Sequence, residues 1–167
     1  MRVLTAAKFK KKLKFNGISE IKLRIWPNDI DVYPEMNNGR HLTLMDLGRY
    51  DLALRSGMLR TAKKNKWKFV VAGGSIRFRR RLPPFRSFQL KSRLSGWDKR
   101  WFYFIQETLR NRKVCSQAVI RAGIRDKQGL VPAEKVVKIF GESESIRLNI
   151  PDWVMEWIKA EESRPEL

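Results

Sequence analysis

The sequence predicts an α+β fold in which an antiparallel sheet wraps around one long helix, with short helices towards the C-terminal end. Two patterns predict it. Apolar and polar residues alternate through much of the region from residue 66 to 125, which is typical of strands with one face in solvent. The second pattern is a helical spacing: Leu42, Met45, Gly48 and Leu52 follow one another at intervals of three or four residues. With 167 residues, the chain can bury a full hydrophobic core without disulfides or a structural metal.

The expected elements follow in a simple order. A first strand is expected at residues 21–25, where apolar and basic residues alternate. The long helix comes next, because Asn37 or Asn38 can cap its start and Gly57 can end it. Four further strands are expected around residues 76–81, 88–94, 101–105 and 118–124, with a hairpin turn at residues 95–98.

Two shorter helices are expected at Pro132–Phe140 and Pro151–Glu161. Trp153 and Trp157 are four residues apart, so they should share one face and dock on the body. The segment Trp101–Ile105 is apolar at every position, which favours a central strand covered by the core on one face and by a partner on the other. We therefore expect a homodimer or a tetramer.

The charge distribution is strongly basic and uneven. Lys and Arg number 36 against 17 Asp and Glu, a net charge of +19, and the excess lies before residue 141. Two basic blocks, at Lys8–Lys14 and Arg77–Arg93, would attract polyanions or serve solubility alone. We divide the chain into a basic N-terminal arm, residues 1–17, and a single domain, residues 18–167. An anionic membrane surface would suit the arm, whereas nucleic acid is disfavoured because the aromatic residues at 102–105 are expected to be buried.

Several functional classes are excluded. One cysteine, Cys115, and one histidine, His41, cannot form a disulfide framework or a Cys/His metal centre within one chain, so we expect no metal and no cofactor. The common nucleotide-binding, metalloprotease and nucleophile-elbow motifs are missing from the sequence. No run of about 18 apolar residues and no signal-peptide core is found, which predicts a cytoplasmic protein, with peripheral membrane attachment as the alternative.

The loop that precedes the long helix is the strongest candidate for chemistry. It contains three carboxylates, Asp29, Asp31 and Glu35. The first turn of a helix has free N–H groups and the positive end of the dipole, so the start near Asn37 and Asn38 could polarise a carbonyl. Asp31 could activate water or attack directly. The competing interpretation is that these side chains only form turn and cap hydrogen bonds.

Residues 29–42, DIDVYPEMNNGRHL, resemble the D-x-D-x-x-x-H-[MV]-N-N-x-x-Y-L signature of the hotdog-fold thioesterases, which include the 4-hydroxybenzoyl-CoA and acyl-ACP thioesterases. The segments SIRFRRRL, residues 75–82, and LSGWDKRWFY, residues 94–103, resemble the branch whose animal members are called thioesterase superfamily member six. The resemblance implies a hotdog fold, dimers with active sites at the subunit interface, and hydrolysis of acyl-CoA or acyl-ACP.

The resemblance also implies roles for individual residues. Asp31 takes the place of the family's catalytic carboxylate. The helix start that polarises the substrate carbonyl in the family corresponds to the backbone of Met36, Asn37, Asn38 and Gly39. Asp46 matches an acidic helix residue that serves some relatives, although an ion pair with Arg49 or Arg40 is the competing interpretation.

The chain departs from the family pattern at two positions of the loop. Glu35 stands where many relatives have His, and we retain it as a candidate catalytic residue; Tyr33 replaces the Asn of acyl-ACP thioesterases. His41 occupies the usual Tyr position and is interpreted as a helix-face residue. These departures keep open a second function, a non-catalytic protein that binds acyl groups or an anionic membrane surface.

The phosphates of CoA need cationic partners, which Arg77, Arg79 and Arg80 could supply if they are more than a solvated sheet face. Gly73, Gly74 and Ser75 enter the same strand and would allow close approach of a ligand or a partner subunit.

Overall fold

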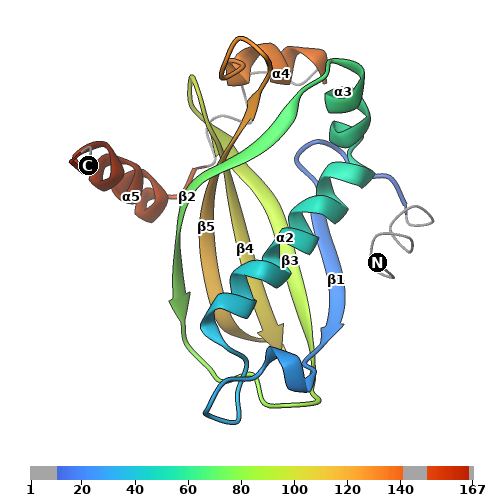
Figure 1. Cartoon of the computed structure of the whole chain (residues 1–167), viewed down its shortest axis with the longest axis vertical. Coiled ribbons are helices and arrows are strands. Elements are labelled where there is room, and N and C mark those ends of the chain that lie inside the picture. The colour runs from blue at the N-terminus through green and yellow to red at the C-terminus, as the bar shows by residue number, and fades with distance from the viewer. Residues whose placement is uncertain (1–10, 141–149, 166–167) are drawn as a thin grey trace.

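The computed structural model describes residues 11–140 and 150–165. It confirms the predicted architecture, because a five-stranded antiparallel sheet curves around one long helix (Figure 1). The strand order is β1-β3-β4-β5-β2. The elements in chain order are β1 (Ile18–Arg24), the 3-10 turn η1 (Pro27–Asp29), α2 (Asn38–Arg55), α3 (Met58–Lys64), β2 (Lys68–Phe78), β3 (Ser87–Trp97), β4 (Phe102–Arg110), β5 (Lys113–Arg125), α4 (Ala133–Ile139) and α5 (Asp152–Glu162).

The predicted bounds of the long helix are confirmed. Asn37 is its N-cap, and the side-chain oxygen of Asn37 accepts a hydrogen bond of 2.8 Å from the N–H of Gly39. At the other end, Gly57 adopts a φ of +85°, which non-glycine residues rarely adopt, and the chain turns there into α3. Helix α3 was not expected from the sequence.

The face of α2 that lies on the sheet is more polar than its spacing predicts. Met45 and Leu52 are buried as expected, but Leu42 is 41% exposed and its neighbour His41 is buried in its place. Gly48 permits the helix to approach β3 closely, because a Cβ there would lie 2.2 Å from the hydroxyl oxygen of Ser92. The helix therefore contacts the sheet partly through small and polar groups rather than through an apolar stripe.

Strand β4 is central, as predicted, but its second face is covered by the chain itself. Helix α5 packs on the face of the sheet opposite α2, because alternate residues of β4 belong to two separate apolar clusters, one with α2 and one with α5. Its buried residues Val154 and Ile158 pack with Tyr103 and Ile105 of β4. The expectation that a partner subunit covers this face is thus wrong. Of the two tryptophans expected to dock, Trp157 packs edge-on against Tyr103, whereas Trp153 is 42% exposed.

Other differences concern strand ends and edges. The β3–β4 turn begins only at Asp98, because β3 continues through a bulge at Leu94–Gly96 to Trp97. Strand β2 is an edge strand that is exposed on both faces, not on one. The alternation of apolar and polar residues shows which face of a strand is buried, but it does not show whether the strand has a neighbour on both sides, so an edge strand cannot be recognised from it alone.

The N-terminal region only partly falls within the described residues. Residues 1–10 of the expected arm lie outside them. Residues 11–17 lie against the body: the N–H of Leu13 donates to the carbonyl of Arg55, and Phe15 is 3% exposed and stacks on Phe140. Within residues 11–140 and 150–165, no helix has both the length and the hydropathy to cross a membrane.

Candidate functional site

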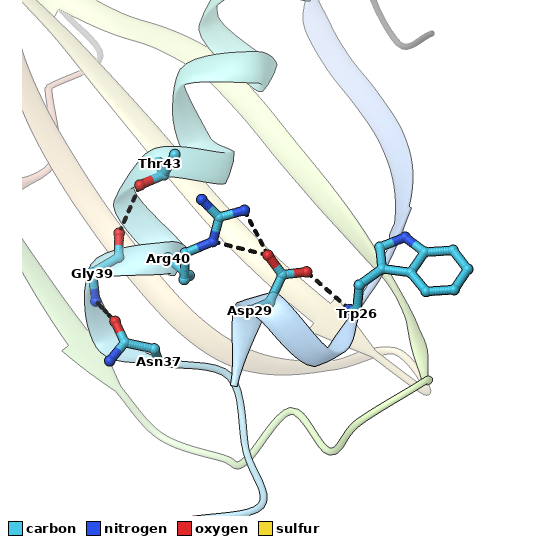
Figure 2. Close-up of polar contacts among 6 residues, drawn as sticks. All are labelled: Trp26, Asp29, Asn37, Gly39, Arg40 and Thr43. Carbon is cyan, nitrogen blue, oxygen red and sulfur yellow. Dashed lines mark hydrogen bonds and ion pairs between the residues drawn. The ribbon is translucent and has the colours of Figure 1, made fainter. Parts of the chain in front are cut away.

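The loop from β1 to α2 is held in place by Asp29. This carboxylate is 4% exposed and accepts hydrogen bonds from the N–H of Trp26 at 2.9 Å and from the guanidinium of Arg40 at 2.8 and 2.6 Å (Figure 2). Its carbonyl also accepts from the N–H of Asn37 at 2.8 Å. Asp29 thus ties the first turn of α2 to the preceding loop, a structural role that engages both of its carboxylate oxygens.

The first turn of α2 has one backbone donor to spare. The N–H of Gly39 donates to the side chain of Asn37, and those of Arg40 and His41 donate to the carbonyl of Asn37. Among the described residues, no acceptor contacts the N–H of Asn38. This group is therefore available to an external acceptor, at the end of the helix where the dipole favours negative charge.

A crevice of about 200 Å³ opens at this helix start. It lies between the loop, the first turn of α2 and the segment that follows β2. Its lining comprises Glu35, Met36, Asn38, His41, Phe78, Arg79, Arg80, Arg81 and Leu82. The crevice is therefore lined by Asn38, whose N–H has no acceptor among the described residues, together with residues that carry a carboxylate, an imidazole and three guanidinium groups.

The three predicted catalytic carboxylates lie in different places. Glu35 lines the crevice and forms an ion pair of 3.2 Å with Arg81. Asp31 does not line the crevice; it is half-buried in the same loop, its N–H donates to the carbonyl of Glu35 at 3.3 Å, and one of its carboxylate oxygens accepts a 2.9 Å hydrogen bond from the N–H of Tyr33. Asp46 is far along α2, where it pairs with Arg49 and lines a separate apolar pocket of about 240 Å³. The structure thus places Glu35 in the crevice lining, keeps Asp31 in the same loop but outside that lining, and separates Asp46 from both.

The predicted substrate-binding residues divide in the same way. Met36, Asn38, Arg79 and Arg80 line the crevice, with Asn37 and Gly39 in the adjoining cap. Gly73, Gly74 and Ser75 do not line it; they lie in the middle of β2, paired with β5. A Cβ at Gly74 would approach Ile120 and Val119 within 3 Å, so this glycine serves contact within the sheet. Arg77 is exposed on β2, outside the crevice lining.

His41 is the site residue whose position the sequence did not reveal. It is 4% exposed, and its Nδ1 lies 2.9 Å from the hydroxyl oxygen of Ser116 on β5. Its ring meets the edge of Phe78 at a centroid distance of 5.0 Å. Burial lowers the pKa of His41 from 6.5 to about 4, so the imidazole is neutral at pH 7. Only the partner on β5, 75 residues away, distinguishes it from an ordinary helix-face histidine.

Comparison with known proteins places this geometry in a family. Residues 25–158 match the model of the thioesterase-like superfamily. The chain belongs to that superfamily. Among curated members, Protein THEM6 of Xenopus laevis is 30% identical over 153 residues, which cover 90% of this chain and 70% of that protein. The resemblance found in the sequence is thereby confirmed.

Solved structures show that the fold is the hotdog fold of such thioesterases. The probable thioesterase YbaW of Escherichia coli has a TM-score of 0.68 at 20% identity, covering 73% of this chain and 95% of that one. Slr0204, a 1,4-dihydroxy-2-naphthoyl-CoA thioesterase from Synechocystis, has a TM-score of 0.61 at 11% identity, covering 74% and 95%. At these identities the likeness establishes the fold.

Proposed function

We propose that this protein hydrolyses an acyl thioester, with acyl-CoA as the substrate class, at the start of α2. The observation that carries the proposal is that Asn38, whose N–H has no acceptor among the described residues, lines one crevice with Glu35, whose carbonyl accepts from the N–H of Asp31. Membership of the thioesterase-like superfamily supports the reaction class. The name of the Synechocystis protein, a CoA thioesterase of the same fold, supports the carrier.

The chemistry follows from the types of group present. The carboxylate of Asp31 would take a proton from water while the water oxygen adds to the thioester carbon. The negative charge on the carbonyl oxygen would develop against the N–H of Asn38 and the positive end of the helix dipole. Collapse of the intermediate would break the carbon–sulfur bond, and the protonated Asp31 would return its proton to the leaving thiolate. Glu35, paired with Arg81, would help to hold the loop over the site.

The arginines beside the crevice would bind the carrier. Arg79 and Arg80 line both the crevice and an adjoining hollow that includes Lys113. Arg80 is oriented by a 2.7 Å hydrogen bond from its guanidinium to the carbonyl of Val114. Guanidinium groups bind phosphate in bidentate fashion, so these side chains suit the phosphates of CoA.

We further propose that two copies pair along β2. This strand has eleven residues, lies at the edge of the sheet and is exposed on both faces, with Phe69 and Val71 among its exposed apolar side chains. A long apolar edge strand presents unpaired backbone groups that another strand can complete. Helix α5 covers the back of β4, so the edge and not the back of the sheet is the expected interface.

A second candidate function is binding of acyl groups without turnover. The hydrogen bond between Asp31 and the N–H of Tyr33 favours it, because this is the geometry of an ordinary Asx-turn. In this case the protein would bind acyl-CoA and release no thiol.

The deciding experiment compares Asp31→Asn with Asp126→Asn. The carboxylate of Asp126 accepts from the N–H of Gln128 at 2.8 Å, the same two-residue turn as at Asp31, but in the turn after β5, at the far end of the sheet from the crevice (Figure 1). Thiol release from acetyl-, octanoyl-, palmitoyl- and benzoyl-CoA should fall by roughly 100-fold in Asp31→Asn, the scale for losing a general base. Asp126→Asn should keep the wild-type rate. Equal rates in all three proteins would contradict the role of Asp31, and binding without thiol release would favour the second candidate.

A further inference from the structure

The hydrogen-bond chain behind His41 determines which of its ring nitrogens carries the proton. Nδ1 of His41 lies 2.9 Å from the hydroxyl of Ser116, which in turn lies 2.7 Å from the hydroxyl of Thr108. The oxygen of Thr108 also accepts from the N–H of Ser116 at 3.0 Å. Ser116 and Thr108 are both fully buried, so each hydroxyl hydrogen needs an acceptor within the protein.

Only one direction of this chain uses both hydroxyl hydrogens. If Thr108 donates to Ser116 and Ser116 donates to Nδ1, both are used and the imidazole proton resides on Nε2. In the reverse direction the hydroxyl of Thr108 would have no acceptor among the described residues, at a cost of about 1–3 kcal/mol. The chain of hydroxyls thus sets the tautomer in which Nε2 is a donor.

The Nε2–H group of His41 has no acceptor among the described residues, although the residue is only 4% exposed. His41 is also one of the residues that line the crevice. The charged groups around the crevice are Glu35 and the guanidiniums of Arg79, Arg80 and Arg81, and none of them bonds to the ring. Nε2 does not belong to the buried side-chain atoms that lack a partner in the described part of the chain, so it reaches accessible surface, where a bound molecule can replace water as its acceptor.

We propose that Nε2–H of His41 is the second hydrogen-bond donor to the thioester carbonyl oxygen, beside the N–H of Asn38. Both donors come from the first turn of α2 and from residues that line the same crevice. The imidazole is neutral, so it donates a hydrogen bond without transferring its proton, and the oxyanion is stabilised by a group fixed in advance by β4 and β5. The inference rests on the proposed thioester hydrolysis, and it makes His41 a catalytic residue in addition to Asp31.

Two substitutions separate this role from a structural one. The amide nitrogen of Gln can take the place of Nε2, and the amide of Asn can take that of Nδ1. His41→Gln therefore keeps the donor to the crevice and loses the contact with Ser116, whereas His41→Asn does the reverse. We expect kcat on the best CoA ester of the panel to fall by roughly 100-fold or more in His41→Asn, the scale for one oxyanion donor, and by less than about tenfold in His41→Gln. A larger loss in His41→Gln than in His41→Asn, or equal rates in all three proteins, would overturn the proposal.

A binding experiment tests the donor independently of turnover. The probes are acyl-CoA analogues in which methylene replaces sulfur, leaving a ketone, and matched alkyl-CoA thioethers that lack the carbonyl. Wild type and His41→Gln should bind the ketone roughly tenfold or more tighter than the thioether, and His41→Asn should bind both equally. If the wild type releases no thiol yet shows this preference, hydrolysis fails and the donor role stands. If the wild type hydrolyses thioesters but binds the ketone no tighter than the thioether, or binds neither analogue, the donor role fails.

Discussion

Burial of His41 should make the stability of the fold depend on pH in a way that one substitution can isolate. His41 is the only histidine of the chain, and burial lowers its pKa from 6.5 to about 4. The unfolded chain therefore binds a proton between pH 6.5 and 4 that the folded chain does not. The neutral imidazole contributes no penalty above pH 6.5, and folding stability is lost as the pH falls through this window towards 4.

The magnitude follows from the two pKa values. Between pH 7 and pH 5, the linkage costs the folded state about 2 kcal/mol, and about 3 kcal/mol by pH 4. His41→Gln cannot titrate, so its unfolding free energy should lack this component while sharing the contributions of all the carboxylates. The comparison uses urea unfolding at pH 7, 6 and 5 and constant ionic strength. From pH 7 to pH 5, the unfolding free energy of the wild type should fall by about 2 kcal/mol more than that of His41→Gln.

The outcome that refutes this reasoning is a pair of parallel stability curves. Parallel curves would mean that His41 titrates alike in the folded and unfolded chains, so the ring would be solvated in the folded state. That result would also remove the basis for a neutral donor in the crevice, because a solvated imidazole would not be held in one tautomer by Ser116.

Two further predictions concern packing and assembly. Gly48→Ala should destabilise the fold by about 1–3 kcal/mol in urea unfolding despite the better helix propensity of Ala, because its Cβ would lie 2.2 Å from Ser92 Oγ. The loss should shrink when Ser92 is also changed to Ala, and an unchanged loss in the double variant would contradict the stated clash. Val71→Lys on the exposed edge of β2 should convert a dimer to a monomer in sedimentation velocity, since lysine disfavours pairing of edge strands. A wild type that sediments as a monomer at all concentrations would refute the pairing.

The fold was predictable where local chemistry decides it. The cap at Asn37 and the positive φ at Gly57 set both ends of α2, and both are visible in the sequence. The sequence could show that β4 is apolar on both faces, but not that α5 of the same chain covers one of them. Periodicity reports which faces are buried, whereas the identity of the covering element depends on the tertiary arrangement.

The candidate site was predictable to the level of one loop and one helix start. Asp31 and Glu35 lie in that loop, and the structure brings Arg79 and Arg80 to it because β2 ends beside the start of α2. The contact of His41 with Ser116 could not be predicted, since that hydroxyl lies on a strand far along the chain. Long-range hydrogen bonds between polar core residues have no period in the sequence.

The polar contacts between α2 and the sheet explain why this helix start can hold a site at all. In addition to its apolar packing, α2 is fixed by polar contacts at three successive levels. Nδ1 of His41 meets Ser116, the carbonyl of Met45 accepts from Gln106 at 2.8 Å, and Asp51 accepts from Ser19 at 2.6 Å.

Each contact has its partner on a different strand, namely β5, β4 and β1. A displacement of one turn, about 5.4 Å, would leave buried polar groups unpaired at about 1–3 kcal/mol each. The first turn of α2 is thereby fixed relative to the arginines that follow β2. The proposed mechanism needs this, because the two donors on α2 must meet the carbonyl oxygen of a thioester whose CoA is bound by those arginines.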